Sequence, residues 1–195
     1  MSELGRVDQG DEAHRAKTIE LIGQIHAAEP RCVLVVTGGG VAALSWLLGV
    51  PGASRTILEG MVPYAGPALA DFLGYEPAQS VSTDTARAMA RAALARAHRL
   101  DPDPAGALLG VAVTAALVSD RPKRGEHRAH VAVADDRGGR DWTLVLDKGR
   151  RSRMAEDALV SALVVAALAE SCHIDAGVPP GLGPGDFLTS SPPRS

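Results

Sequence analysis

The sequence predicts an α/β domain, specifically a three-layer α/β/α sandwich around a mixed, mostly parallel sheet. Three observations support this fold class. Short apolar runs typical of buried strands alternate along the chain with longer segments whose apolar residues recur at helical spacing. Two strand-like runs flank the segment "DDRGGR" in the manner of a hairpin, which makes the sheet mixed. The composition, 46% hydrophobic but 3% aromatic among 195 residues, suits an aliphatic core between helices and a sheet.

The first part of the chain predicts a helix, a strand, a tight loop and a second helix. Apolar residues at helical spacing indicate a helix over residues 12–28, which ends at a Glu-Pro pair because proline disfavours helix in the residue before it. The continuous β-branched run at 32–36 is typical of a strand covered on both faces. Residues 37–40 connect it directly to a helix that runs to about Gly49, and a second strand is expected over 56–62.

The second part of the chain completes the layers. After a short helix in "PYAGPALADFLG", Ser82-Thr83-Asp84 caps a long helix that ends at Leu100. A buried strand is expected over 108–117, and strands over 130–134 and 142–147 form the hairpin. The helix over 151–172 is apolar on so many sides that it must pack deeply.

These elements predict one α/β domain over residues 11–173. It is preceded by a flexible N-terminus, 1–10, and followed by a tail, 174–195, whose glycine, proline and serine content predicts disorder. The longest apolar run, 158–169, is too short to cross a bilayer, and the N-terminus lacks the apolar stretch of a secretion signal. We therefore expect a soluble, cytoplasmic protein with no membrane partner.

The net charge and the cysteine content argue against two further kinds of protein, those that bind nucleic acid and those that bind a metal ion through cysteines. The formal net charge of -3 argues against a generally basic surface, so no nucleic-acid partner is expected. Cys32 and Cys172 are isolated from each other in sequence and show no metal-ligand spacing. Both are expected to be reduced thiols, and no metal site is predicted.

A glycine corner, Gly38, Gly39 and Gly40, joins the first strand to its helix. A glycine-rich turn lets a ligand approach the backbone, and the unpaired N–H groups of a helix N-terminus favour an anion such as phosphate or carboxylate. The structural alternative is a left-handed turn that permits tight packing of helix on strand. The segment carries no complete dinucleotide or phosphate-loop fingerprint.

A basic loop follows the strand over 108–117, with a local formal charge of +2. Ligands of α/β sheets bind beyond the carboxyl ends of the strands, so this loop and the glycine corner would share one phosphate-binding crevice if their strands run the same way. The alternative is a solvated loop whose charges serve solubility. The candidate phosphate-binding residues of the loop are Arg121, Lys123, Arg124, His127 and Arg128, with His130 close by.

Several of these segments resemble the CinA C-terminal domain family, the nicotinamide-nucleotide amidohydrolases. "TGGGVAALSWLLGVPGAS" is similar, without gaps, to the family's Ser-Cys-Thr-Gly-Gly motif, apolar helix and Val-Pro-Gly-Ser-Ser turn. "TILEGMVPY", "FLGY", "VSTDTARAMARAALARA" and "GVAVTAAL" resemble the segments that follow in the family. The resemblance covers about residues 19–170 and implies a Rossmann-like domain, often dimeric, that hydrolyses the carboxamide of nicotinamide mononucleotide without a cofactor.

The resemblance also implies which residues act. The family uses a serine, a tyrosine and a lysine, and the matching positions hold Thr37 or Ser54 as candidate nucleophiles and Tyr64 as the tyrosine. The lysine position holds Leu69, which cannot accept a proton. Ser54, Tyr64 and Thr37 each have a plainer role open to them, in capping a turn, burying a ring or bonding the loop backbone.

Three functions therefore remain open on the sequence. The first is an amidohydrolase-like enzyme acting on nicotinamide mononucleotide or a related phosphorylated nucleotide. The second is a nucleotide-binding or regulatory module of the same fold that has lost or rewired the catalytic site, as Leu69 suggests. The third is a purely structural dimerisation domain, and a homodimer is expected in any of these cases.

Overall fold

Six helices and six strands make up the part of the chain that the computed structural model describes, residues 8–121 and 124–192. The helices are α1 (Asp8–Ala27), α2 (Ala42–Gly49), α3 (Ala53–Thr56), α4 (Gly66–Leu73), α5 (Thr83–Leu100) and α6 (Arg153–Ser171). The strands are β1 (Arg31–Thr37), β2 (Ile57–Met61), β3 (Leu108–Ala116), β4 (His127–Asp135), β5 (Gly138–Leu146) and β6 (Phe187–Ser190).

One mixed sheet holds all six strands in the order β2-β1-β3-β4-β5-β6. β1 is parallel to both β2 and β3, whereas the β3–β4, β4–β5 and β5–β6 pairs are antiparallel. The mixed sheet is confirmed, but its parallel part is smaller than expected. The reason is that the hairpin extends the sheet beyond β3 and a further strand then pairs with the hairpin's outer edge.

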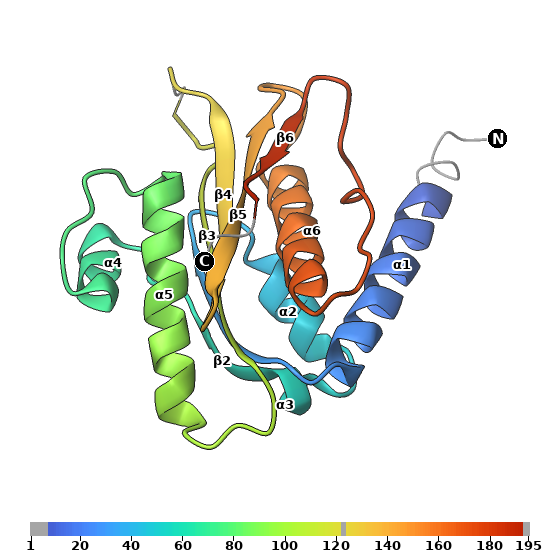
Figure 1. The fold of residues 1–195 in the computed structure, drawn as a ribbon. Coiled ribbons are helices and arrows are strands. Elements are labelled where there is room, and N and C mark those ends of the chain that lie inside the picture. Colours follow the sequence, from blue (N-terminus) through green and yellow to red (C-terminus); the bar gives the residue numbers. More distant parts are fainter. Residues whose placement is uncertain (1–7, 122–123, 193–195) are drawn as a thin grey trace.

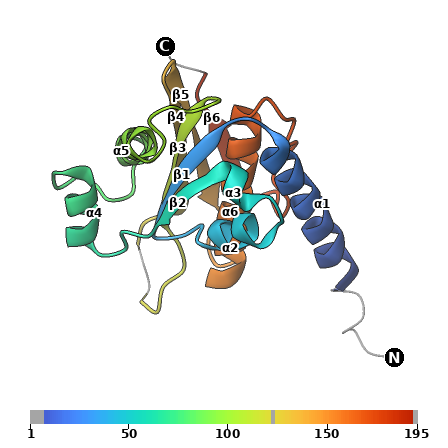
Figure 2. The same cartoon turned by 90° about the horizontal axis from the view of Figure 1, so that it is seen from below.

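Helices cover both faces of the sheet, which confirms the three-layer sandwich (Figure 1). α5 lies along one face, with α4 outside it, and α1, α2 and α6 cover the other (Figures 1 and 2). Each face has its own apolar core: Val33, Val35 and Met89 belong to the α5 side, and Leu34, Val36 and Leu163 to the α6 side. Neighbouring residues of β1 thus point to opposite cores, as the continuous apolar run predicted.

The last long helix packs as deeply as its sequence predicted. Every residue of α6 from Leu159 to Ala169 is buried, because the helix lies between the sheet and the helices α1 and α2. Its N-terminus is capped by the Ser152 hydroxyl, which accepts a hydrogen bond from the backbone N–H of Ala155. Among the described residues, no helix combines the length and the apolar character needed to span a bilayer.

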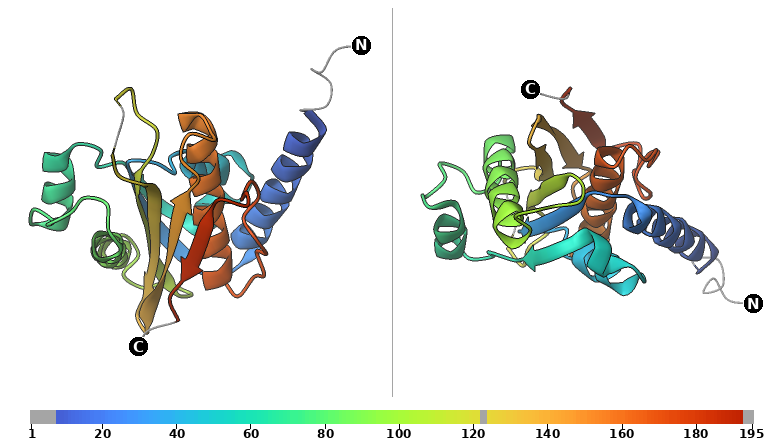
Figure 3. Two further views of the ribbon diagram at one scale, coloured as in Figure 1. Left: turned by 90° about the horizontal axis from the view of Figure 1, so that it is seen from above. Right: turned by 60° about the horizontal axis from the view of Figure 1, so that its bottom comes forward.

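The structure describes residues 174–192, for which disorder was expected, as a loop followed by the strand β6 and two further residues. β6 pairs with β5, with Leu188 opposite Leu144, and closes that edge of the sheet (Figure 3). The Asp186 carboxylate anchors the segment because it accepts hydrogen bonds from Arg151 and from the backbone N–H of Asp147 and Gly183. The glycines and prolines of this segment therefore belong to an irregular loop. The pairing of β6 with β5 and the ion pair of Arg151 with Asp186 hold the loop in place.

The N-terminal prediction falls partly outside the described residues. Residues 1–7 are not described, and residues 8–10, expected to be flexible, form the first turn of α1. The cysteines are separate thiols: Cys32 is buried in β1 and Cys172 lies at the end of α6. Burial, reinforced by Cys172, raises the pKa of Cys32 to about 12, and burial raises the pKa of Cys172 to about 11.

Candidate functional site

The carboxyl ends of β1, β2 and β3 meet at one edge of the sheet, because these strands are parallel. The chain leaves β1 for α2 on one face and leaves β2 for α4 on the other face. Such a change of direction between neighbouring strands is where α/β sheets form ligand crevices. Tyr64, directly after β2, is 68% exposed at this edge, so the edge is our candidate functional site.

The glycine corner at this edge brings the chain against β3. Gly38 has φ 75°, and a Cβ built on it would lie 1.9 Å from the carbonyl oxygen of Ala115. A Cβ on Gly39 would lie 2.5 Å from the Leu117 side chain. No side chain larger than hydrogen fits at these two positions without a shift, so the corner serves close packing of loop on strand.

The helix N-terminus at this corner already holds an anion, the carboxylate of Asp157. Its Oδ1 accepts hydrogen bonds from the backbone N–H of Gly40 (2.7 Å) and Val41 (3.3 Å), and its Oδ2 accepts one from Ala42 (3.2 Å). An acidic side chain of the same chain thus lies where the sequence predicted that an external anion binds. These three donors, of which only the N–H of Gly40 belongs to the glycine corner, are therefore engaged with Asp157, whereas phosphate binding by Gly38 and Gly39 stays a prediction.

The basic loop lies at the same edge as the corner, since β1 and β3 are parallel. Arg121 and Arg124 are exposed there, and Arg128, on β4, is half-buried with its Nη2 3.4 Å from the carbonyl oxygen of Val81. Lys123 lies outside the described residues. Arg153 links the start of the loop to the corner, because its guanidinium donates hydrogen bonds to the carbonyl oxygens of Val118 and Gly38.

His127 serves the base of this loop rather than its surface. The side chain is buried, and its Nδ1 lies 2.7 Å from Oε1 of Glu156, which is fully buried on α6. The other carboxylate oxygen of Glu156 accepts a hydrogen bond from the backbone N–H of Val118. The pair holds the two ends of the loop together, so His127 does not face a ligand from the exposed side of the loop.

The structure separates the two candidate nucleophiles. Ser54 lies in α3, before β2, whereas Tyr64 follows β2. Five residues of strand span about 16 Å, so these two side chains lie at opposite edges of the sheet and cannot act together within one chain. Thr37 lies at the end of β1 on the Tyr64 side, where its hydroxyl donates a 3.0 Å hydrogen bond to the carbonyl oxygen of Pro63.

Leu69, at the position where the family resemblance implies a lysine, belongs to the core. It is 2% exposed on α4 and lies in the apolar cluster of Val33, Val35 and Met89. A leucine in this cluster stabilises the packing of α4 on the body of the domain. The position therefore supplies apolar contact and no proton acceptor.

Sequence reasoning missed a row of polar side chains that crosses the sheet at this edge. Thr37 on β1 pairs with Thr114 on β3, Thr114 with His130 on β4, and His130 with Thr143 on β5. Residues paired directly across strands share a face, and here that face is the one under α5. The alternation of side chains along each strand predicts which face each residue lies on. Only the register between the strands shows that these four residues lie side by side.

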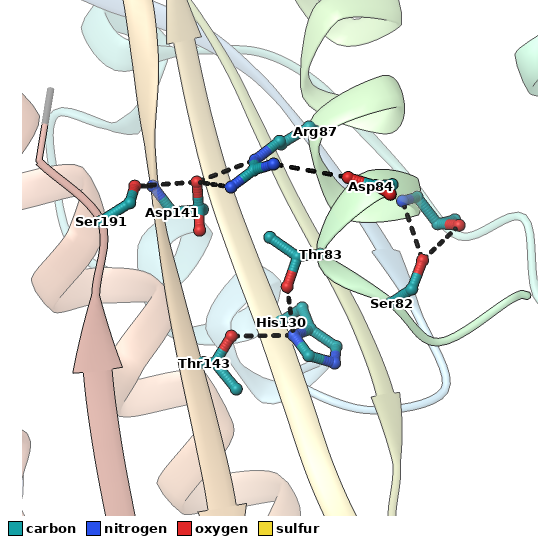
Figure 4. A network of polar contacts seen from close by, with 9 residues as sticks. Ser82, Thr83, Asp84, Arg87, His130, Asp141, Thr143 and Ser191 are labelled. Carbon is teal, nitrogen blue, oxygen red and sulfur yellow. Dashed lines mark hydrogen bonds and ion pairs between the residues drawn. The ribbon is translucent and has the colours of Figure 1, made fainter. Parts of the chain in front are cut away.

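The N-terminus of α5 and the loop before it cover this row. The Thr114 hydroxyl donates to the carbonyl oxygen of Ser80 (2.6 Å), and the Thr83 hydroxyl lies 3.1 Å from Nδ1 of His130 (Figure 4). Thr143 lies 2.9 Å from the same nitrogen. The arrangement places an imidazole between two hydroxyls.

In residues 8–121 and 124–192, no three His, Cys, Asp or Glu side chains are placed to hold a metal ion.

Comparison with known proteins gives the fold a family. The family model of the CinA C-terminal domain matches residues 32–169. None of the curated proteins compared matches the sequence.

Solved structures agree with this match. A competence/damage-inducible protein from Agrobacterium tumefaciens is 22% identical, with a TM-score of 0.59 over 80% of this chain and 94% of its own. A CinA superfamily protein from Klebsiella pneumoniae is 13% identical, with a TM-score of 0.64 over 82% and 98%. One from Escherichia coli is 18% identical, with a TM-score of 0.57 over 81% and 88%. The fold is shared, and because the family model covers most of the chain, the chain belongs to the family of the CinA C-terminal domain.

Proposed function

We propose that this CinA domain is a hydrolase that binds a small phosphorylated nucleotide at the carboxyl edge of β1, β2 and β3 and cleaves its carboxamide. Nicotinamide mononucleotide is the first substrate to test, because the sequence resembles the nicotinamide-nucleotide amidohydrolases. The observation that carries the proposal is the row of hydroxyls and imidazole, Thr37 to Thr143, which lies at the edge where sheets of this kind bind ligands.

Charge and shape at the same edge support a nucleotide. Arg128 is on β4 two residues before His130, so both side chains point to the α5 face, and Arg121 and Arg124 lie in the exposed loop beside it. Guanidinium groups suit phosphate because they donate two parallel hydrogen bonds to it. The exposed ring of Tyr64 at the end of β2 offers a surface on which a pyridine ring can stack.

A second candidate is a binding module without turnover, and Leu69 specifically favours it. The family's lysine is replaced by a core leucine, and the Thr37 hydroxyl is engaged with Pro63. In this case the same edge binds the nucleotide and no carboxamide is cleaved. The homodimer implied by the family resemblance is part of either proposal, and light scattering of the native protein tests it.

One pair of measurements separates the candidates. Calorimetry with nicotinamide mononucleotide reports binding, and an ammonia assay on the same protein reports hydrolysis. We expect Arg128→Ala to weaken binding about tenfold to a hundredfold, since a hydrogen bond to a charged group contributes about 1.5–3 kcal/mol. The matched control is Arg137→Ala, an exposed arginine in the β4–β5 turn at the opposite edge. Binding without ammonia supports the module, and folded protein with neither rejects both candidates.

A further inference from the structure

His130 is held by two hydroxyls from different elements. It lies on β4, is 7% exposed, and its Nδ1 is 3.1 Å from Oγ1 of Thr83 on α5 and 2.9 Å from Oγ1 of Thr143 on β5. Figure 4 shows its second ring nitrogen directed away from both hydroxyls, and Nε2 has no hydrogen-bond partner in the part of the chain that the structure describes. A proton on Nε2 leaves the Nδ1 lone pair to accept from a hydroxyl.

The surroundings keep this imidazole neutral. Burial lowers the pKa of His130, the charge of Arg128 lowers it further, and Asp141 acts in the opposite direction. Asp141 is itself engaged, because Arg87 on α5 donates to it at 2.9 Å and the Ser191 hydroxyl donates at 2.8 Å (Figure 4). At neutral pH the ring is therefore uncharged and able to take a proton, which is what a general base requires.

Of the two hydroxyls, Thr83 is the better placed to meet a ligand. It is the first residue of the 18-residue helix α5, at the edge of the sheet, whereas Thr143 lies within β5, paired with His130 on β4 and with Thr189 on β6. The Ser82 hydroxyl accepts a hydrogen bond from the N–H of Thr85. The N–H groups of Thr83 and Asp84 precede the first intrahelical hydrogen bond and so are donors available to a developing oxyanion.

We propose that Thr83 is the nucleophile and His130 the general base of carboxamide hydrolysis in this protein, doing the work that Leu69 cannot do. This inference rests on the proposed function. Nδ1 of His130 takes the Thr83 hydroxyl proton as Oγ1 bonds to the carboxamide carbon. Collapse of the tetrahedral intermediate breaks the carbon–nitrogen bond, and His130 returns the proton to the departing ammonia. Water, deprotonated by His130, then attacks the carbonyl carbon of the Thr83 ester. The bond from this carbon to Oγ1 breaks, His130 returns the proton to Oγ1, and the carboxylic acid leaves.

The test measures ammonia release from nicotinamide mononucleotide by five forms of the full chain: wild type, Thr83→Val, Thr83→Ser, His130→Gln and His98→Gln. We expect Thr83→Val and His130→Gln to lose about 10²–10⁴-fold in kcat, and Thr83→Ser to stay within about tenfold of wild type, because serine restores the hydroxyl. His98→Gln is the matched control, since His98 is an exposed α5 histidine paired with Asp136. Thermal melts and calorimetry show that each variant folds and binds.

Two further measurements distinguish a catalytic role of Thr83 and His130 from a merely structural one. The kcat of wild type falls toward acid with a midpoint below pH 6.5, since the pKa of His130 is lowered and its base form is lost on protonation. Added hydroxylamine yields the hydroxamate of the nucleotide, because it captures the ester on Thr83. Wild-type hydrolysis that survives in folded Thr83→Val or His130→Gln overturns this inference and leaves the proposed function standing. If folded wild type does not hydrolyse the nucleotide, both this inference and the proposed hydrolase function are overturned.

Discussion

The carboxylate of Asp157 offers the sharpest test of what occupies the glycine corner. Asp157, on α6, accepts hydrogen bonds from the N–H groups of Gly40, Val41 and Ala42 and so joins α6 to the start of α2. Asp157→Ala leaves these three donors unpaired. Loss of a helix cap costs about 0.5–2 kcal/mol, and the bonds to a charged acceptor place this case at about 2–3 kcal/mol.

The assay is thermal and urea unfolding of wild type and variants. For a domain of this size, about 2–3 kcal/mol corresponds to a fall in Tm of about 4–12 °C. Asp157→Asn keeps an oxygen acceptor without the charge, so we expect a fall between those of wild type and Asp157→Ala. Asp136→Ala is the control, since it removes an exposed carboxylate from the β4–β5 turn and changes the net charge equally.

Inorganic phosphate supplies the second half of the experiment. Because Asp157→Ala frees a helix N-terminus, phosphate should raise the Tm of this variant more than that of wild type at equal ionic strength. Any phosphate bound by the basic loop stabilises both proteins and cancels in the comparison. Equal gains in the two proteins, or a loss of less than about 0.5 kcal/mol in Asp157→Ala, refute the assignment of Asp157 as the corner's anion.

Three further predictions follow from the placement of single residues. Leu69→Lys introduces the amine that the family resemblance implies, but it puts this amine in the α5-side core. We expect the free energy of unfolding in urea to fall by about 3–5 kcal/mol and ammonia release not to rise. Higher activity of this variant contradicts the prediction. Ser54→Ala should leave any hydrolytic rate within about twofold of wild type, because Ser54 lies at the opposite edge from Tyr64, and a large fall in kcat argues for a site shared between chains. Asp186→Asn should destabilise the protein at neutral pH. Burial acts to raise the pKa of Asp186, but hydrogen bonds from Arg151, Asp147 and Gly183 outweigh it and lower the pKa to about 2. Because this pKa lies below the ordinary value of 3.8 for an aspartate, the stabilisation is present above pH 3.8 and is lost as the pH falls through 2. Urea unfolding of both proteins from pH 2 to 6 checks the sign, and a difference that grows toward acid contradicts it.

Local patterns predicted the elements well because they depend on few neighbours. The β-branched run of β1, the Ser82 cap of α5 and the hairpin of β4 and β5 each carry their signal within a short window. The tail was the exception. Its glycines and prolines predicted disorder, but pairing with β5 and the Arg151–Asp186 ion pair involve partners more than 30 residues away.

The candidate site was predictable only in part for the same reason. The sequence predicted that the glycine corner and the basic loop lie at one edge if their strands run the same way, and the parallel pairing of β1 and β3 meets that condition. It left open whether Thr37 or Ser54 accompanies Tyr64. The direction of β2 decides this, because it puts Ser54 before the strand and Tyr64 after it. No spacing rule in the chain revealed that Asp157 would reach the corner.

The sequence by itself predicted the fold class and the family, and the resemblance implies a lysine at the position that Leu69 holds. These conclusions depend on the identity of single residues and on patterns over a few neighbouring residues, so they do not require knowledge of long-range contacts. Only the tertiary structure decided which groups meet at the carboxyl edge. Strand register aligned Thr37, Thr114, His130 and Thr143, and helix packing brought Thr83 to His130. The physical reason is that register and packing join groups dozens of residues apart, and such contacts leave little local trace.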